Sequence, residues 1–566
     1  MLCIEAALVL LSLVIAFIYP SLGSHWFEKL EQRLSQLSRR QALSVILIGT
    51  TALGLRAALL PIEPIPEPIV HDEFGYLLAA DTFAHGRLTN PTHPMWVHFE
   101  SFSILQKPTY QCFAQPAQGM MLAFGKVVFG HPFWGVWLSV GLMCAAITWM
   151  LQGWLPPEWA LLGGVIAILR FGAFGYWANS YWGGSVAAIG GALALGALPR
   201  ITDSHRIGDA LAMGLGLALL ANSRPYEGFI LGASIAVALL TGLLGKNRPS
   251  LSISLGHVIL PLTLLVALIA AGLGYYLWRV TGSPFRMPYQ IEQETYAVAP
   301  YMAWQHTRPY PLYNNPVIEK MYAKEALAGY EFFRSPLGQL AKCYLAWDFF
   351  LGPVLTLPFL LLVFALPRDF TWRTIGSTTW ALLVFAGIFI AGTALESFYN
   401  AHYSAPITAL ILGLVLLAMR QLRHWGRPGV FLTRAILTIC ILTVGLRAAT
   451  RPLHIPLSEF YEFAWHQKGP TSFGRAVIQR QLEQLPGRHL VIVHYQTDHE
   501  PFAEWVYNDA DIDKSKVAWA RQIDHDRDAK LVDYFHDRHI WILDADENPP
   551  KLTELPSSAS AIAEGK

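Results

Sequence analysis

Long apolar segments recur through most of this chain and constrain its fold more than any other feature. A helix needs about 20 residues to cross the hydrocarbon core of a bilayer. We expect about twelve such spans, near residues 2–19, 41–60, 134–152, 158–176, 183–199, 208–222, 226–245, 254–280, 337–366, 374–395, 402–419 and 429–447. Hydrophobic residues make up 53% of the 566 residues and charged residues only 14%. A soluble domain carries about 25% charge, so we expect an α-helical integral membrane protein.

Lysine and arginine mark alternate connections between these segments. Residues 20–40 are basic, and so is every second connection after them, at Arg200 and Arg206, Lys246 and Arg248, Arg368 and Arg373, and Arg420, Arg423 and Arg427. The short connections 177–182 and 396–401 contain no Lys or Arg. Because basic loops stay in the cytoplasm, loops 61–133 and 281–336 and the tail are expected outside. This predicts a multi-pass protein of the cell (inner) membrane with its C-terminal part facing the periplasm or exterior.

The first segment, 2–19, resembles a signal peptide only in its apolar run. Its positive charges follow that run, and no Ala-x-Ala site ends it. We expect a retained span. The chain then divides into an extra span with a cytoplasmic connector at 1–40, a transmembrane domain at 41–447 and an extracytoplasmic domain at 448–566.

The tail, 448–566, has no spanning segment. Residues 489–495 and 539–543 are expected to be buried strands and 516–520 a weaker third, with helices near 499–508 and 526–538. Strands that alternate with helices predict a small parallel α/β domain. It contains no Gly-rich phosphate loop, so we expect no nucleotide there. Its histidines lack the spacing of a metal site and are expected to be solvated.

Two adjacent carboxylates in outer loop 61–133 are the most informative polar residues. A Pro-rich stretch ends at Ile69, and apolar residues then recur at helical spacing to His85. Asp72 and Glu73 occupy the first turn, where the helix dipole favours acids, and Tyr76 follows Asp72 at i+4 on the same face. An ordinary acidic helix start is the simpler interpretation. At the membrane surface, however, an acid is well placed to act as a general base on a hydroxyl.

The order of these features resembles the GT-C superfamily of membrane glycosyltransferases, which includes the protein O-mannosyltransferases and the lipid A aminoarabinose transferases. The resemblance covers about 41–447. It rests on a span, a Pro-containing stretch and an Asp-Glu pair that opens a juxtamembrane helix. Weaker similarities follow in order, at residues 115–119 (Gln-Pro-Ala-Gln-Gly), 223–228 (Ser-Arg-Pro-Tyr-Glu-Gly) and 402–406 (His-Tyr-Ser-Ala-Pro).

The resemblance implies a reaction. A hexose or pentose moves, on the outer face, from a polyprenyl-phosphate donor to a hydroxyl of a glycan, lipid or protein acceptor. Asp72 would be the base, Glu73 would orient the acceptor or support Asp72, and the anomeric centre would invert.

A phosphate leaving group needs cations or strong hydrogen-bond donors around it. The candidates for phosphate or substrate binding are Tyr76, Lys107, Tyr110, Arg170, Arg224, His402 and Tyr403. Most have a structural alternative. Arg224 suits an interfacial side chain, and Arg170 suits a buried ion pair. Lys107 suits a solvated charge, and His402 and Tyr403 suit an aromatic belt.

Whether the reaction needs a divalent metal depends on the residues of the turn at 177–182. Some relatives place a second acid there, where a metal can bridge two carboxylates, but this chain has Asn179 and Ser180. We therefore expect no metal or other cofactor, with a divalent metal as the alternative. Outer loop 281–336 combines aromatic residues with carboxylates, which suits either sugar binding or a plain lid.

Net charge and cysteine spacing provide evidence on nucleic-acid binding and on disulfides, and two other classes of membrane protein remain as rivals. A net charge of +1 leaves no basic field for nucleic acid. The five cysteines are scattered and are expected to be free thiols. A transporter, with Arg170 on its substrate path, is one rival. A non-catalytic membrane scaffold is the other.

Overall fold

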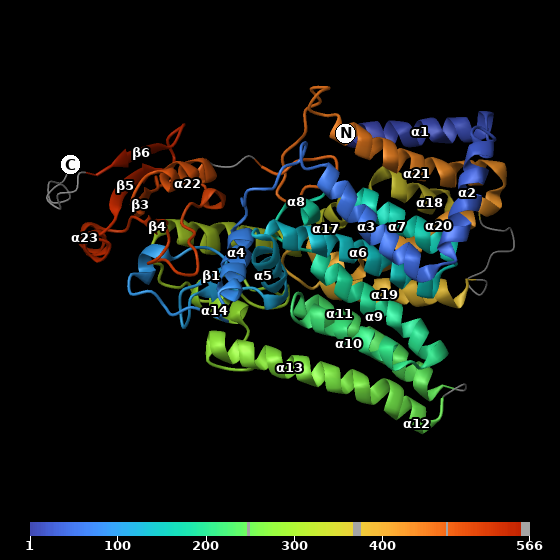
Figure 1. The fold of residues 1–566 in the computed structure, drawn as a ribbon, viewed down its shortest axis with the longest axis horizontal. Helices are drawn as coiled ribbons and strands as arrows, with labels where there is room; N and C mark the ends of the chain where they lie inside the picture. The colour runs from blue at the N-terminus through green and yellow to red at the C-terminus, as the bar shows by residue number, and fades with distance from the viewer. Residues whose placement is uncertain (246–248, 366–374, 471–473, 556–566) are drawn as a thin grey trace. The chain divides into compact units, whose positions relative to one another are not determined.

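The computed structural model describes residues 1–245, 249–365, 375–470 and 474–555 (Figure 1). The chain forms two compact units. The helical unit comprises Met1–Pro66, Val136–Ala271 and Pro336–Gly469, and the mixed unit comprises Glu67–Gly135, Gly272–Ser335 and Pro470–Lys566. The basic residues Lys246, Arg248, Arg368 and Arg373 lie outside the described residues.

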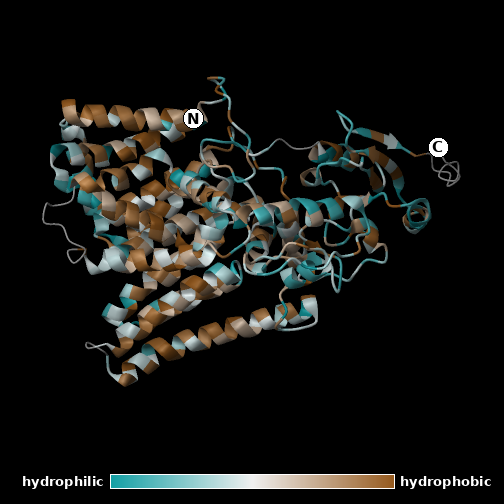
Figure 2. Cartoon of the chain, turned by 180° about the vertical axis from the view of Figure 1, so that it is seen from behind, coloured by the Kyte–Doolittle hydropathy of each residue, from teal (hydrophilic) through white to brown (hydrophobic). Residues whose placement is uncertain are grey.

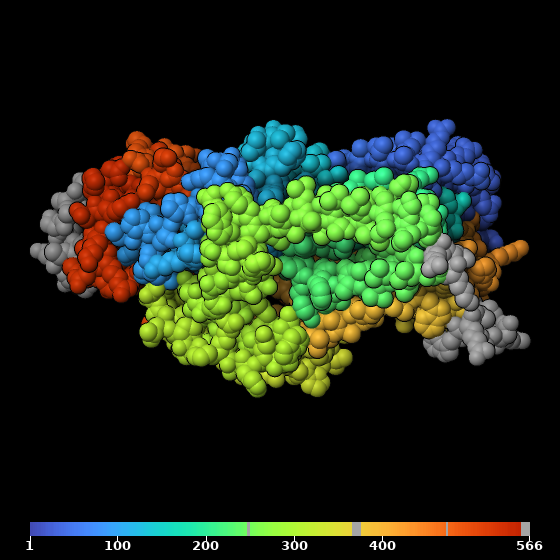
Figure 3. Space-filling view, turned by 90° about the horizontal axis from the view of Figure 1, so that it is seen from below, coloured from blue at the N-terminus to red at the C-terminus, as the bar shows by residue number. Residues whose placement is uncertain are grey.

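The helical unit is built from helices, most of them apolar and brown along much of their length in Figure 2, whereas the helix Ser24–Ser38 is polar. They are α1 (Leu2–Ile18), α2 (Ser24–Ser38), α3 (Gln41–Ala58), α6 (Phe133–Trp154), α7 (Pro157–Phe171), α8 (Tyr176–Asn179), α9 (Ser185–Ser204), α10 (Ile207–Ala221), α11 (Pro225–Leu244), α12 (Leu251–Ile253), α13 (Leu260–Thr281, which continues into the mixed unit), α17 (Pro336–Phe350), α18 (Gly352–Ala365), α19 (Ser377–Thr393), α20 (Thr408–Leu422) and α21 (Arg427–Ala448). Figure 3 shows α12 and the first part of α13 as a ridge on the surface.

The number of spans differs from the expected twelve. Among the described residues, seven helices are long and apolar enough to cross a membrane, or eight if the bent pair α17–α18 counts as one span. Helices α1, α10 and α19 are apolar but shorter. The expected straight span 337–366 is bent by 105°. The bend falls at Gly352, whose φ of +56° is a conformation that side-chain-bearing residues rarely adopt.

The predicted residues His402 and Tyr403 are positioned by a close contact between two backbone segments. They lie on a 3₁₀ segment, Ala401–Ile407, which packs against α9. A Cβ atom on Gly191 of α9 would lie 1.7 Å from the carbonyl oxygen of Pro406. Only glycine allows the backbones to come this close.

The mixed unit combines helices with two sheets. Its helices are α4 (His71–Ala84), α5 (Pro116–Phe129), α14 (Pro288–Thr295), α15 (Pro316–Glu319), α16 (Ala326–Arg334), α22 (Arg475–Gln484) and α23 (His525–Tyr534). The strands β1 (Ile104–Leu105) and β2 (Gln111–Cys112) form a hairpin. The larger sheet has the order β4-β3-β5-β6, from β3 (His489–His494), β4 (Val517–Arg521), β5 (His539–Asp544) and β6 (Lys551–Glu554).

The tail follows its sequence pattern with one exception. Strands β3, β4 and β5 are parallel, as alternating strands and helices predict, and β6 adds an antiparallel edge. The expected helix 499–508 is wrong, because only a single 3₁₀ turn, Pro501–Ala503, forms there. Instead, the Glu504 carboxylate accepts the backbone N–H groups of Trp505 and Val506, at 3.0 and 2.8 Å. Such local bonds compete with helix formation.

Both faces of the larger sheet are covered by hydrophobic clusters. One face packs with α4 and the β1 region in a cluster that includes Phe74, Leu78, Ile104, Leu490 and Ile492. The opposite face packs against α22 in a cluster that includes Leu482, Val491 and Trp519. Helix α4, which carries the two predicted carboxylates, is therefore part of the tail's own hydrophobic core.

Candidate active site

The start of α4 is fixed by Glu73. Val70 is extended, the helix begins at His71, and one oxygen of the buried Glu73 carboxylate accepts the N–H groups of Ile69 and Val70, both at 2.9 Å. Backbone donors at a helix start otherwise lack an intrahelical partner. The structure therefore uses Glu73 to anchor the turn that presents Asp72.

Asp72 is half-buried and has a defined partner. The Ser103 hydroxyl donates to Asp72 Oδ1 at 2.6 Å. Gly75 permits this contact, because a Cβ there would lie 2.9 Å from the Ser103 carbonyl oxygen and 3.1 Å from Cys112 Sγ. A carboxylate held by a short bond to a hydroxyl, with part of its surface open, has the properties required of a general base.

Glu292 of α14 is a second acid of this region, and the sequence analysis did not single it out. Its carboxylate accepts hydrogen bonds from the hydroxyls of Tyr322 at 2.6 Å and Tyr301 at 3.1 Å. Burial, with a smaller contribution from the charge of Asp72, raises the pKa of Glu292 to about 7, although the hydrogen bonds from Tyr322 and Tyr301 lower it. A buried acid with a strongly shifted pKa is a feature that functional sites often share. Its signal in the sequence was the mixture of tyrosines and carboxylates in loop 281–336.

The other predicted residues of the mixed unit have contacts of their own. The hydroxyl of buried Tyr110 donates to the carbonyl of Asn508 at 3.1 Å. The Lys107 ammonium lies 4.0 Å from the centre of the Trp96 ring, and Tyr76 is buried in α4. The contacts of Tyr110 and Lys107 do not lead to Asp72, so their substrate roles stay predictions.

The remaining predicted residues belong to the helical unit. The Arg224 guanidinium lies 4.7 Å from the centre of the Tyr403 ring and 3.9 Å from Glu227 Oε1. His402 is buried, with Nδ1 3.0 Å from the Tyr176 hydroxyl. The structure thus brings Arg224 and Tyr403 together beside His402.

Arg170 is bound inside the helical unit. It donates to the carbonyls of Asp348 at 2.7 Å and Phe349 at 3.1 Å, and its Nη1 is 3.9 Å from Glu5 Oε1 of α1. These contacts favour the structural ion pair that the sequence left open. Its role toward phosphate stays a prediction.

A second buried cation, Lys342 of α17, was missed by the sequence analysis. Its ammonium donates to the carbonyl of Glu396 at 2.6 Å. Burial raises the pKa of Glu396, the charge of Glu227 adds to that effect, and the charges of Arg224 and Lys342 oppose it. Arg224 and Lys342 therefore act on one carboxyl group. The signal was a lysine within an apolar helix, which is costly in lipid without a partner or a function.

Lys342 also lines an apolar groove of about 350 Å³ between α17, α18, α19 and α20. Most of the lining is aliphatic or aromatic, and the polar groups include Tyr399 and Ser404, whose hydroxyls lie 3.0 Å apart. A groove of this composition fits an apolar chain with an anionic end at Lys342.

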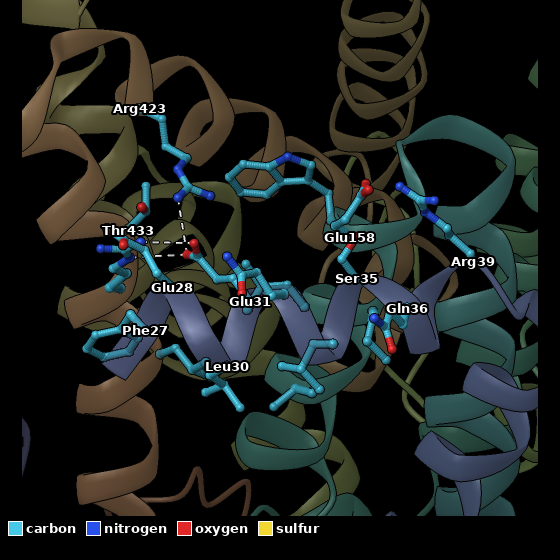
Figure 4. Close-up of a pocket in the computed structure, with 18 residues that line it drawn as sticks. Phe27, Glu28, Leu30, Glu31, Ser35, Gln36, Arg39, Glu158, Arg423 and Thr433 are labelled. Carbon is cyan, nitrogen blue, oxygen red and sulfur yellow. Dashed lines mark hydrogen bonds and ion pairs between the residues drawn. The ribbon is translucent and has the colours of Figure 1, made fainter. Parts of the chain in front are cut away.

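A larger cavity, about 760 Å³, lies beside α2 (Figure 4). Its Glu31 accepts hydrogen bonds from Arg423 at 3.1 Å and from Arg434 at 2.9 and 3.1 Å. These three charges are paired with one another, and the positive-inside pattern predicts that this end faces the cytoplasm. We therefore do not place the chemistry there.

Metal ligands are not clustered in the part of the chain that the structure describes, where no group of three or more His, Cys, Asp or Glu side chains is arranged to hold an ion. Asp72 and Glu292 supply two carboxylates near each other. The expectation of a metal-independent reaction stays a prediction.

No protein-family model matches the sequence, and no curated protein does. Solved structures do match. The apo oligosaccharyltransferase of Archaeoglobus fulgidus has a TM-score of 0.46 at 12% identity, over 80% of this chain and 62% of its own. Its complex with Zn and sulfate has a TM-score of 0.46 at 13% identity, over 82% of this chain and 61% of its own. ArnT from Cupriavidus metallidurans, bound to undecaprenyl phosphate, has a TM-score of 0.45 at 11% identity, over 88% of this chain and 93% of its own.

The chain spans about 62% of the length of the oligosaccharyltransferase. At these identities and scores, no residue of this chain takes its role from these structures. The roles below rest on its own contacts.

Proposed function

We propose that this protein is a membrane glycosyltransferase that moves a sugar from a polyprenyl-phosphate carrier to an acceptor hydroxyl on the outer face. The observation that carries the proposal is the environment of the Asp72 side chain. It is a half-buried carboxylate at a helix start, oriented by Ser103 and close to the buried acid Glu292. An acid that only stabilises a helix start requires neither a hydroxyl partner such as Ser103 nor a second buried acid beside it.

The reaction follows from this placement. Asp72 takes the proton of the acceptor hydroxyl while the oxygen attacks the anomeric carbon. The bond from that carbon to the phosphate oxygen breaks, and the lipid phosphate leaves with the electron pair. Attack opposite the leaving group inverts the anomeric centre. Glu73 supports Asp72 by fixing the turn that carries it.

The carrier binds in the helical unit. The isoprenoid chain occupies the groove between α17, α18, α19 and α20, and its phosphate lies at Lys342 and Arg224. Charge-assisted hydrogen bonds from such cations are about twice as strong as neutral ones. His402 and Tyr403 are further donors next to Arg224.

Binding and transfer assays test the two parts of the proposal separately. In nanodiscs, Lys342→Ala and Arg224→Ala should each weaken polyprenyl-phosphate binding by about tenfold, the loss of roughly 1.4 kcal/mol. Arg427→Ala, on an exposed cytoplasmic position, is the control. If both variants bind like the control, the groove is not the carrier site.

Transfer is measured with a panel of labelled polyprenyl-phosphate hexoses and pentoses, with and without EDTA. We expect transfer of one sugar class, unchanged by EDTA. Transfer lost in EDTA and restored by Mg²⁺ or Mn²⁺ would contradict the metal-independent mechanism. Absence of transfer, together with carrier-dependent flux across proteoliposomes, would favour the transporter.

A further inference from the structure

His71, the residue directly before Asp72, is held by the C-terminal segment. Its Nε2 lies 2.9 Å from the carbonyl oxygen of Pro501. Its ring stacks on Phe102 on one side, with centroids 4.4 Å apart, and on Phe502 on the other, with centroids 5.2 Å apart and planes 8° from parallel. The side chain is only 5% exposed. Residues more than 400 positions apart therefore form one three-ring stack at the start of α4.

The hydrogen bond defines the chemical state of His71. A carbonyl oxygen only accepts, so Nε2 carries the proton. Burial lowers the pKa of His71, while the Pro501 carbonyl and the acids Asp72 and Glu504 oppose that effect. The hydrogen bond to Pro501 and the two stacked rings fix the orientation of the imidazole.

Two rings of the stack, those of His71 and Phe102, are next in sequence to Asp72 and to its hydrogen-bond donor. His71 precedes Asp72 in the helix, and Phe102 precedes Ser103, whose hydroxyl donates to Asp72 Oδ1. A shift of the Phe102 or His71 ring would therefore move the carboxylate, its hydrogen-bond donor, or both. Misplacement of a catalytic group by 1 Å can reduce a rate by about 10².

Two further contacts tie α4 to the same tail. Phe74 stacks on Tyr507, with centroids 3.9 Å apart and planes 1° from parallel. Asp81 Oδ2 accepts the N–H of Ala510 at 2.8 Å. The tail therefore contacts α4 in its first turn, at His71 and Phe74, and in its last turn, at Asp81.

We propose that the C-terminal segment around Pro501 and Phe502 is a positioning element for Asp72, acting through His71 and Phe102. This inference rests on the proposed function and adds a role for the tail. His71, Phe102 and Phe502 are positioning residues, and none of them touches the reacting atoms.

The test compares two substitutions of Phe502 in the full-length protein in nanodiscs. Phe502→Leu keeps apolar bulk but removes the ring, and Phe502→Tyr keeps the ring. We expect kcat to fall about tenfold to 10² in Phe502→Leu, with KM for the polyprenyl-phosphate sugar unchanged, and to return to within a few-fold of wild type in Phe502→Tyr.

A control variant separates positioning from loss of stability. Leu552→Ala removes apolar volume from the opposite face of the same sheet, in the cluster that packs against α22. It should lower the melting temperature of the protein and leave kcat near wild type. Equal losses of kcat in Leu552→Ala and Phe502→Leu, or no loss in Phe502→Leu, would overturn the inference. If Asp72→Asn also transfers at the wild-type rate, the proposed function fails as well.

Discussion

Two adjacent carboxylates at the start of α4 have different environments. Glu73 is buried and binds two backbone N–H groups, whereas Asp72 is half-buried and accepts from Ser103. The sequence placed both in the first turn but did not indicate their different environments. The structure separates them because the chain before the helix is extended, which aims the free N–H groups of residues 69 and 70 at Glu73.

Glu292 makes stability depend on pH. Burial raises its folded-state pKa from 4.5 to about 7, so the folded protein holds a proton there that the unfolded chain releases. Its contribution is therefore present below pH 4.5 and is lost as pH rises to about 7. The loss is of the order of 3 kcal/mol. Glu292→Gln should remove this slope.

Thermal melts of the wild type and Glu292→Gln at pH 4.5, 6 and 8 provide the measurement. The difference in melting temperature between the two proteins should shift in favour of the variant as pH rises. A constant difference at all three values would contradict the raised pKa of Glu292.

Helix α4 depends on one glycine to reach the β1–β2 hairpin. In Gly75→Ala, the new Cβ would lie 2.9 Å from the Ser103 carbonyl oxygen, so one of the two backbones must shift. Overpacking of this kind costs about 1–3 kcal/mol, and the same shift should lengthen the Ser103–Asp72 bond and reduce transfer.

Gly54→Ala in α3 is the matched control, because a Cβ there meets nothing within 4 Å. An alanine in an open helical position should leave stability unchanged or raise it by up to about 1 kcal/mol. If urea unfolding and transfer rates show no difference between the two variants, the close approach at Gly75 is not required.

Local sequence patterns predicted helices and strands correctly where a single short pattern is enough to determine the secondary structure. The strands near 489–495, 516–520 and 539–543 and the acidic start of α4 follow from apolar runs and helical spacing, although β5 is mostly half-buried where a buried strand was expected. The pattern failed at 499–508, where the Glu504 carboxylate binds the backbone. It failed again at Gly352, where a positive φ bends a long apolar segment. Glu292 and Lys342 were missed because their environments are made by distant residues.

Each of the two units is built from three segments of the chain, so the chain passes between the units five times. The tail was expected to be a separate domain from residue 448, and that division remains a prediction, although Leu490, Ile492 and Phe535 of the tail share a core with α4. The sequence could not indicate this, because the contacts join residues near 71–110 to residues near 490–535.

The positive-inside pattern predicts that the tail lies outside the cytoplasm. A reporter that is active only in the cytoplasm, fused after Lys566, should stay silent, and one that is active only outside should respond. The same pair fused after Arg427, in an expected cytoplasmic connection, should give the reverse. A cytoplasmic signal at Lys566 would contradict the orientation and place Asp72 on the wrong side for an outer-face acceptor.

The central claim is that Asp72 is the base of a glycosyl transfer. In Asp72→Asn, the amide keeps the shape of the side chain and still accepts the Ser103 hydrogen bond, but it takes no proton at neutral pH. With purified protein and a labelled polyprenyl-phosphate sugar, transfer should fall by about 10²–10⁴, while carrier binding and the melting temperature remain near wild type. Transfer by Asp72→Asn at the wild-type rate would contradict the claim.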